Sequence, residues 1–182
     1  MSQLPHKIGF VCSTLAIALI AQAQGVKMAA LESFEKRFEA KLGQVPPPFP
    51  FEVMFPAPAV YVPSSGVVLS SIVCLSYIDP PSPFRVPYTD KEKAEFRERK
   101  LKRVPILEQS MREVMVETAV AADMDPVPPN EKIAIGVTLF YYTWEDSSGL
   151  PRQIVMSAEK QKLLQARREK LDLASVIQEQ KL

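Results

Sequence analysis

Histidine and cysteine are scarce in this sequence, which has one histidine and two cysteines among its 182 residues. The only histidine, His6, lies in an apolar leader that we expect to be removed. Without it the mature chain cannot build a histidine general base, a Ser-His-Asp triad or a histidine-ligated metal centre. The sequence also has no glycine-rich phosphate loop, dinucleotide fingerprint or serine nucleophile elbow. We therefore expect no cofactor and no metal, and most familiar hydrolase designs are excluded.

The first 23 residues have the three zones of a cleavable secretory signal peptide. One cation, Lys7, precedes an apolar stretch over residues 8–20, and the small residues Ala21 and Ala23 follow. The apolar stretch is shorter than the roughly 20 residues that span a bilayer. The sequence predicts an exported protein, periplasmic or secreted, that is cleaved after Ala23 and keeps no stable membrane span. An uncleaved leader that anchors the chain is the alternative.

The cysteines and the charge balance restrict the mature chain further. Cys12 leaves with the leader, and bulky Val11 before it disfavours lipoprotein processing. Cys74 then remains alone, so no intramolecular disulfide can form. The chain has 22 basic and 21 acidic residues, and removal of Lys7 leaves the two signs equal. A chain with no net charge has no overall positive electrostatic potential that would attract nucleic acid, so we expect no nucleic-acid partner.

Residues 24–50 are predicted to form an N-terminal helix followed by a proline-rich linker. Leu31, Phe34, Phe38 and Leu42 recur at the spacing of one helix face, which predicts a helix over about 26–42. Gly43 is placed where a helix C-cap glycine belongs. The prolines of residues 46–50 favour an extended conformation. A stiff connector is the preferred interpretation, and a ligand for a proline-recognising partner is the alternative.

A β-hairpin is predicted from two apolar runs, residues 59–62 and 67–78, separated by a turn sequence. Cys74 falls within the second run, on its more polar face. A catalytic thiol would need a neighbouring base, and no mature histidine is present to supply one. We therefore expect Cys74 to be a small, partly buried hydrophobe.

A long helix is predicted over about 89–122, and Thr89 with Glu92 three residues later matches a capping box. Its first half is rich in lysine and arginine, which taken alone would suggest a nucleic-acid or anionic-surface patch. Acidic residues are interleaved with these cations. A solvated helix face is therefore the preferred interpretation.

The remainder of the chain predicts a second hairpin and a C-terminal helix. Alternating apolar residues indicate a strand over 132–144, and a turn leads to another strand over 151–157. From 158 to about 178 the composition favours a helix with solvated charges. Residues 51–182 should thus form a single two-layer α+β domain. We expect an antiparallel sheet of about four strands, in two hairpins, packed by the long helix and the terminal helices.

The best candidate for a functional site lies at the end of the strand predicted over 132–144. This possible binding surface comprises Tyr141, Tyr142, Trp144, Glu145 and Asp146, with Asp79 and Arg85 beside them. Aromatic rings next to carboxylates suit carbohydrate or peptide binding, and two carboxylates are the minimum apparatus of a glycoside hydrolase. Packed strand aromatics followed by a polar turn are the structural alternative.

The functional hypothesis is therefore a non-enzymatic exported protein that acts through interaction with an unknown protein or an envelope component. The missing catalytic residue types favour this hypothesis over catalysis. The rival hypothesis is a carboxylate-only enzyme that acts on glycans.

Overall fold

The computed structural model describes residues 26–45, 51–55, 58–76 and 87–182. The predicted signal peptide, the proline-rich segment 46–50, and the predicted site residues Asp79 and Arg85 lie outside these residues. In chain order the elements are α1 (Met28–Gly43), β1 (Glu52–Phe55), β2 (Val60–Val62), β3 (Gly66–Cys74), α2 (Asp90–Ala119), the 3-10 turn η1 (Ala122–Met124), β4 (Lys132–Leu139), β5 (Gln153–Glu159), α3 (Lys160–Glu169), α4 (Leu173–Val176) and β6 (Gln178–Lys181).

The α+β class is confirmed, and within the described residues the sheet is mixed with six strands rather than antiparallel with about four. Its order is β1-β3-β4-β5-β6, with β2 also pairing with β3. Both predicted hairpins are present, because β2 and β3 pair antiparallel and so do β4 and β5. The central pair, β3 with β4, is parallel. A parallel pair needs a long crossover connection, which α2 provides here.

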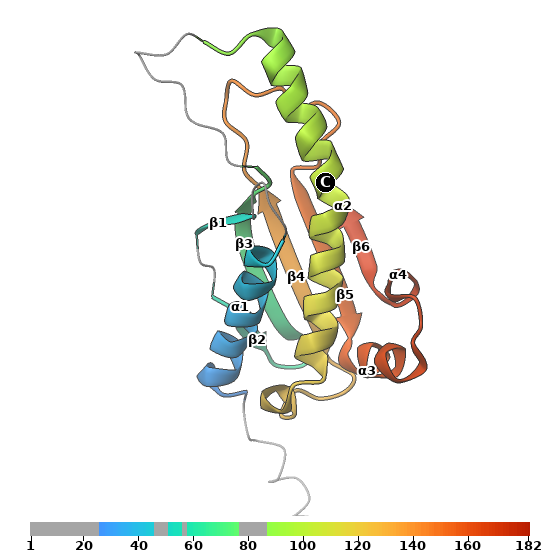
Figure 1. Cartoon of the computed structure of the whole chain (residues 1–182). Helices are drawn as coiled ribbons and strands as arrows, with labels where there is room; N and C mark the ends of the chain where they lie inside the picture. The colour runs from blue at the N-terminus through green and yellow to red at the C-terminus, as the bar shows by residue number, and fades with distance from the viewer. Residues whose placement is uncertain (1–25, 46–50, 56–57, 77–86) are drawn as a thin grey trace, which may run out of the picture.

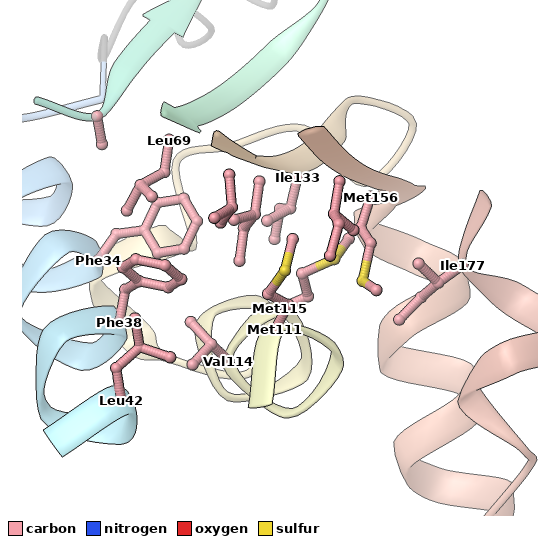
Figure 2. Packing of buried hydrophobic residues seen from close by; sticks show 14 of the residues in the cluster. Phe34, Phe38, Leu42, Leu69, Met111, Val114, Met115, Ile133, Met156 and Ile177 are labelled. Carbon is pink, nitrogen blue, oxygen red and sulfur yellow. The ribbon is translucent and has the colours of Figure 1, made fainter. Parts of the chain in front are cut away.

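The helices α1 and α2 lie side by side across one face of the sheet (Figure 1). They enclose the core with alternate residues of the strands, and Phe34 and Phe38 of α1 meet Leu69 of β3 there (Figure 2). The first turns of α2 extend beyond the end of the sheet (Figure 1). This extension is what brings α2 to the loop that follows β4.

The opposite face of the sheet carries the remaining alternate residues, and those in the middle of β3 and β4 are partly or fully exposed. On β3 and β4 these are Val68, Ser70, Ile72, Ala134, Gly136 and Thr138. The register places Ile72 beside Thr138, at the end of the sheet to which both strands run. The exposed face therefore continues into the candidate site.

The long helix confirms the predicted capping box and corrects the prediction that its charges are solvated. The Thr89 side chain accepts a hydrogen bond from the Glu92 amide, and Glu92 accepts one from the Thr89 amide. In the basic first half, however, Lys100 is 1% exposed and Arg103 is 8% exposed. Arg103 lies over the Phe51 ring, with 4.6 Å between its guanidinium carbon and the ring centroid. Charge pattern alone could not show that residues distant in sequence cover these two cations.

The strand predicted over 132–144 ends at Leu139, five residues early. Its neighbour β3 ends at Cys74, and Pro151 at the start of the returning segment has no amide proton to donate. The last bonds run from the Leu139 amide to the Arg152 carbonyl and from the Phe140 amide to the Val73 carbonyl, both at 2.9 Å. Residues 140–152 are therefore a loop, which we call the β4–β5 loop.

The C-terminal helix predicted over 158–178 is wrong beyond Glu169. The helix α3 ends at Lys170, which adopts a left-handed conformation, and the chain forms α4 and then the strand β6. β6 pairs antiparallel with β5, a partner that local periodicity cannot show. Lys160 is buried rather than solvated, and its Nζ donates to the carbonyls of Met124 and Val127 at 2.7 and 2.9 Å.

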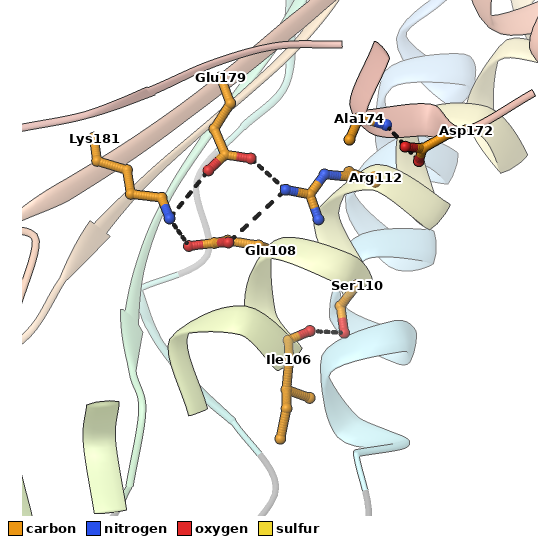
Figure 3. Close-up of polar contacts among 8 residues, drawn as sticks. All are labelled: Ile106, Glu108, Ser110, Arg112, Asp172, Ala174, Glu179 and Lys181. Atoms are coloured by element: carbon orange, nitrogen blue, oxygen red, sulfur yellow. Dashed lines mark hydrogen bonds and ion pairs between the residues drawn. The ribbon is translucent and has the colours of Figure 1, made fainter. Parts of the chain in front are cut away.

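Four charged side chains fasten β6 to α2 (Figure 3). Glu179 pairs with Arg112, and Lys181 pairs with Glu108 at 2.6 Å. Two longer contacts, Lys181 to Glu179 and Arg112 to Glu108, close the set. We call this set the β6 clasp.

Candidate functional site

The β4–β5 loop is held against the first turns of α2 by stacked aromatic side chains. Trp144 stacks on Tyr142 and on Tyr88, with ring centroids 5.5 and 4.9 Å apart. Phe96 of α2 meets both Trp144 and Tyr88 edge-on. All four rings are half-buried. Aromatic pairs at such separations are stabilising, so Tyr142 and Trp144, both predicted site residues, anchor the loop.

The packing of these rings leaves the indole N–H group of Trp144 without a hydrogen bond to any described residue. Its indole Nε1 is buried and has no hydrogen-bond acceptor among the described residues. A buried donor without a partner costs free energy. The aromatic cluster therefore packs the loop against α2 but contains one buried N–H donor that has no acceptor among the described residues.

Glu145, a predicted site residue, forms a buried ion pair with Lys100 of α2. The two side chains are 4% and 2% exposed. The Lys100 ammonium also lies over the Tyr141 ring, 5.1 Å from its centroid. Only one carboxylate oxygen is used, since Glu145 Oε1 is buried without a hydrogen-bond partner among the described residues. The site thus contains a neutralised carboxylate with one free acceptor.

Tyr141 lies inside this arrangement and does not act as a surface ring. Its hydroxyl donates to the Pro151 carbonyl at 2.8 Å, which ties the two ends of the β4–β5 loop together. Burial, and then the nearby Glu145 charge, raise the pKa of Tyr141. The phenol is therefore neutral at physiological pH.

Asp146 points to different partners and belongs to the turn. It accepts a hydrogen bond from the Ser148 amide at 2.9 Å, and Arg97 lies 3.7 Å from its other oxygen. Hydrogen bonds from Ser148 are the main cause that lowers the pKa of Asp146. This carboxylate is exposed and stays ionised, as expected for a polar turn residue.

Cys74 is buried more completely than the sequence indicated, at 2% exposure. Its thiol donates to the Ser76 carbonyl at 3.3 Å. Burial raises the pKa of the Cys74 thiol. A buried, protonated thiol fits the expected packing role rather than that of a nucleophile.

A cavity of about 430 Å³ opens at the end of β4, next to the Lys100–Glu145 pair. We call it the β4-end cavity. Its lining includes Ile72, Thr138, Phe140, Tyr142, Glu145 and Arg152. Thr143 and Ser147 also contribute to its wall. Of the predicted surface, Tyr141, Tyr142 and Glu145 reach this cavity, whereas Asp146 and Trp144 do not line it.

Sequence reasoning missed Arg152, Thr138 and Ile72. Arg152 is exposed, and its side chain makes no ion pair or hydrogen bond within the described part of the chain. Thr138 and Ile72 are paired across the parallel strands β4 and β3. A pairing between two strands that the sequence assigned to different hairpins could not be anticipated, so no local signal identified these residues.

A second hollow, of about 470 Å³, lies between α1 and the middle of α2. Its charged residues are paired with each other, because Lys41 contacts Glu113 at 2.6 Å. Ser110 donates to the Ile106 carbonyl of its own helix. The charged groups and the serine hydroxyl of this hollow are therefore already engaged within the two helices.

Within the described ranges, no group of three histidine, cysteine, aspartate or glutamate side chains comes together to hold a metal ion. Of the helices in the part that the structure describes, none is long and apolar enough to cross a membrane. No protein-family model matches the chain, and no curated protein or solved structure matches it either.

Proposed function

We propose that this protein is exported and acts without catalysis, by binding a protein or envelope component at the β4-end cavity. One observation carries this proposal: Glu145, whose Oε1 is buried and has no hydrogen-bond partner among the described residues, is one of the residues that line an open cavity. A buried acceptor without a donor costs roughly 1–3 kcal/mol. A ligand that supplies the donor recovers this cost, and so this position favours binding.

The state of the carboxylates supports binding over glycoside hydrolysis. A glycosidase needs one carboxyl group that stays protonated near neutral pH to act as general acid. Asp146 is shifted in the opposite direction, since hydrogen bonds lower its pKa. Glu145 is held by Lys100 in a buried ion pair, so one of its two carboxylate oxygens is already engaged.

The placement of the basic residues supports a partner other than nucleic acid. Lys100 and Arg103 are buried beneath neighbouring elements. Lys93 and Arg97 contact Asp90 and Asp146, respectively. The first half of α2 is therefore not a continuous row of free cations.

The binding proposal can be tested through Trp144, the only tryptophan in the chain. It stacks on Tyr142, which lines the cavity, so an occupant should alter its fluorescence. We expect envelope fractions to shift the emission of the wild-type protein and to have less effect on Arg152→Gln. Arg167→Gln, which alters an exposed arginine on α3, is the matched control. Unchanged emission in every fraction would contradict the proposal.

The same fractions separate binding from catalysis. Release of sugars that is lost in Glu145→Gln at an unchanged melting temperature would establish the glycan-hydrolase alternative. Export has a separate test: mass spectrometry of the released protein should find Gln24 as its first residue. Recovery of the intact leader in the membrane fraction would contradict export and release.

A further inference from the structure

We propose that the β4-end cavity binds a sugar acid, a small polyhydroxylated molecule that carries one carboxylate. This inference rests on the proposed function, because it names the ligand class for the same cavity. The charges, the unpaired polar groups and the rings of the cavity wall support it.

The charges of the cavity select a ligand with one negative charge. Glu145 is neutralised by Lys100, and the hydroxyl of Tyr141 is bonded to the Pro151 carbonyl. Arg152 is then left as the lining cation without an anionic partner among the described residues. A guanidinium binds a carboxylate through two parallel hydrogen bonds. The complementary group on the ligand is therefore a carboxylate.

The free oxygen of Glu145 selects a neutral donor on the same ligand. Oε1 is buried and lacks a donor, while the charge of the carboxylate is already balanced by Lys100. A second ammonium would leave excess positive charge in a buried place, which is costly. A hydroxyl group supplies the hydrogen bond without adding charge. A neutral hydroxyl donor therefore favours a sugar acid over an amino acid or a peptide terminus.

The remaining wall suits a sugar ring. Thr138, Thr143 and Ser147 bring hydroxyl groups that make no side-chain hydrogen bond to other described residues. Phe140 and Tyr142 lie edge to face, 5.0 Å apart, and offer apolar ring surface. The volume of about 430 Å³ falls within the range of about 300–1,000 Å³ that is usual for small-ligand sites.

Calorimetric titration of the mature protein with glucuronate, glucose, acetate, a hexuronate oligomer and a dipeptide tests the proposal. Glucuronate carries both features, glucose lacks the carboxylate, and acetate lacks the hydroxyl groups. Because a hydrogen bond to a charged group is stronger than one between neutral groups, we expect glucuronate to bind at least roughly tenfold more tightly than glucose. Acetate should bind more weakly still. The affinity for a hexuronate oligomer, compared with that for glucuronate, distinguishes a free sugar acid from the end of an envelope polysaccharide.

Variants assign the binding to this cavity. Arg152→Gln should remove the difference between glucuronate and glucose, and Arg167→Gln should preserve it. Thr138→Val should weaken glucuronate and glucose together. Glu145→Gln adds a donor beside a buried lysine and can unfold the chain, so Arg152→Gln is the decisive variant.

Several results would overturn the proposal. Equal affinity for glucose and glucuronate would show that Arg152 does not bind the carboxylate. Equal affinity for acetate and glucuronate would show that the cavity binds any small anion and does not recognise the sugar hydroxyl groups. Tighter binding of a dipeptide than of glucuronate would show a peptide ligand instead. If no sugar binds while envelope fractions still shift Trp144 emission, the ligand class is wrong and the proposed function stands.

Discussion

Lys100 of α2 and Glu145 of the β4–β5 loop form an ion pair whose side chains are 2% and 4% exposed, although 45 residues separate them in the sequence. The pair joins the extended start of α2 to the loop that carries the candidate site. The position of the β4-end cavity therefore depends on it.

Removal of one partner of this pair should be strongly destabilising. Lys100→Met leaves the Glu145 carboxylate buried without compensation, and we expect the free energy of unfolding to fall by about 3–5 kcal/mol. Urea unfolding followed by circular dichroism measures this change. The double variant Lys100→Met/Glu145→Met should lose less than the sum of the two single variants. Strict additivity would show that the two charges do not interact.

Gly66 should be intolerant of any side chain. Its φ is +119°, and a Cβ at this position would lie 1.9 Å from the Lys132 carbonyl oxygen. We expect Gly66→Ala to cost at least about 3 kcal/mol, because it combines backbone strain with a clash against β4. Gly136→Ala is the matched control, since a Cβ there meets nothing within 4 Å. Its melting temperature should equal or exceed that of the wild type, and similar losses at both glycines would contradict this account.

Cys74 should be chemically protected in the folded protein. It is buried, and burial raises the pKa of its thiol, so the reactive thiolate is scarce. Iodoacetamide should modify it slowly in buffer and rapidly in urea, as mass spectrometry would show. Cys74→Ser should cost roughly 1 kcal/mol. Fast labelling of the native protein, or a predominant disulfide dimer on a non-reducing gel, would refute the packing role.

The contact between α1 and α2 should weaken in acid. Hydrogen bonds from Lys41, and next from Gln109, lower the pKa of Glu113 from its ordinary value of 4.5. The folded chain therefore holds this proton less readily than the unfolded chain. The resulting stability is present above pH 4.5 and is lost as the pH falls through the lowered pKa.

Urea unfolding at several pH values tests this dependence. Lys41→Met should be less stable than the wild type at pH 7, and the difference should shrink below pH 4.5. Lys36→Met, which alters an exposed lysine of the same helix, is the control and should show no such trend. A constant difference across the pH range would mean that the Lys41–Glu113 contact does not couple to folding.

The β6 clasp should protect the edge of the sheet. Without residues 178–182, the hydrogen-bonding groups of β5 that face β6 would be open, and an open strand edge favours association between chains. We expect the truncated chain to aggregate, as light scattering would detect. Arg112→Gln should loosen β6 to a smaller extent, measured by faster amide exchange at Val155, whose partner in the register is Gln180. Unchanged scattering and exchange would show that β6 contributes nothing to the edge.

Elements governed by local chemistry were predictable from the sequence. The apolar spacing of Phe34 and Phe38 is enough to specify the buried face of α1. Thr89 and Glu92 start α2 because capping involves residues three positions apart. The two hairpins followed from turn residues between apolar runs, and together these features gave the α+β class.

What only the tertiary structure decided involves partners that are distant in sequence. The parallel pairing of β3 with β4 brings Ile72 beside Thr138, and the addition of β6 to β5 replaces the end of the predicted C-terminal helix. The burial of Lys100 is decided by Glu145 and Tyr141, which reach it from the β4–β5 loop. The sequence by itself determined which segments have a helical or strand period, because that depends on neighbouring residues. Which charges are buried and which remain free depends on contacts across the fold, so Arg152 and the free oxygen of Glu145 emerge only from the tertiary structure.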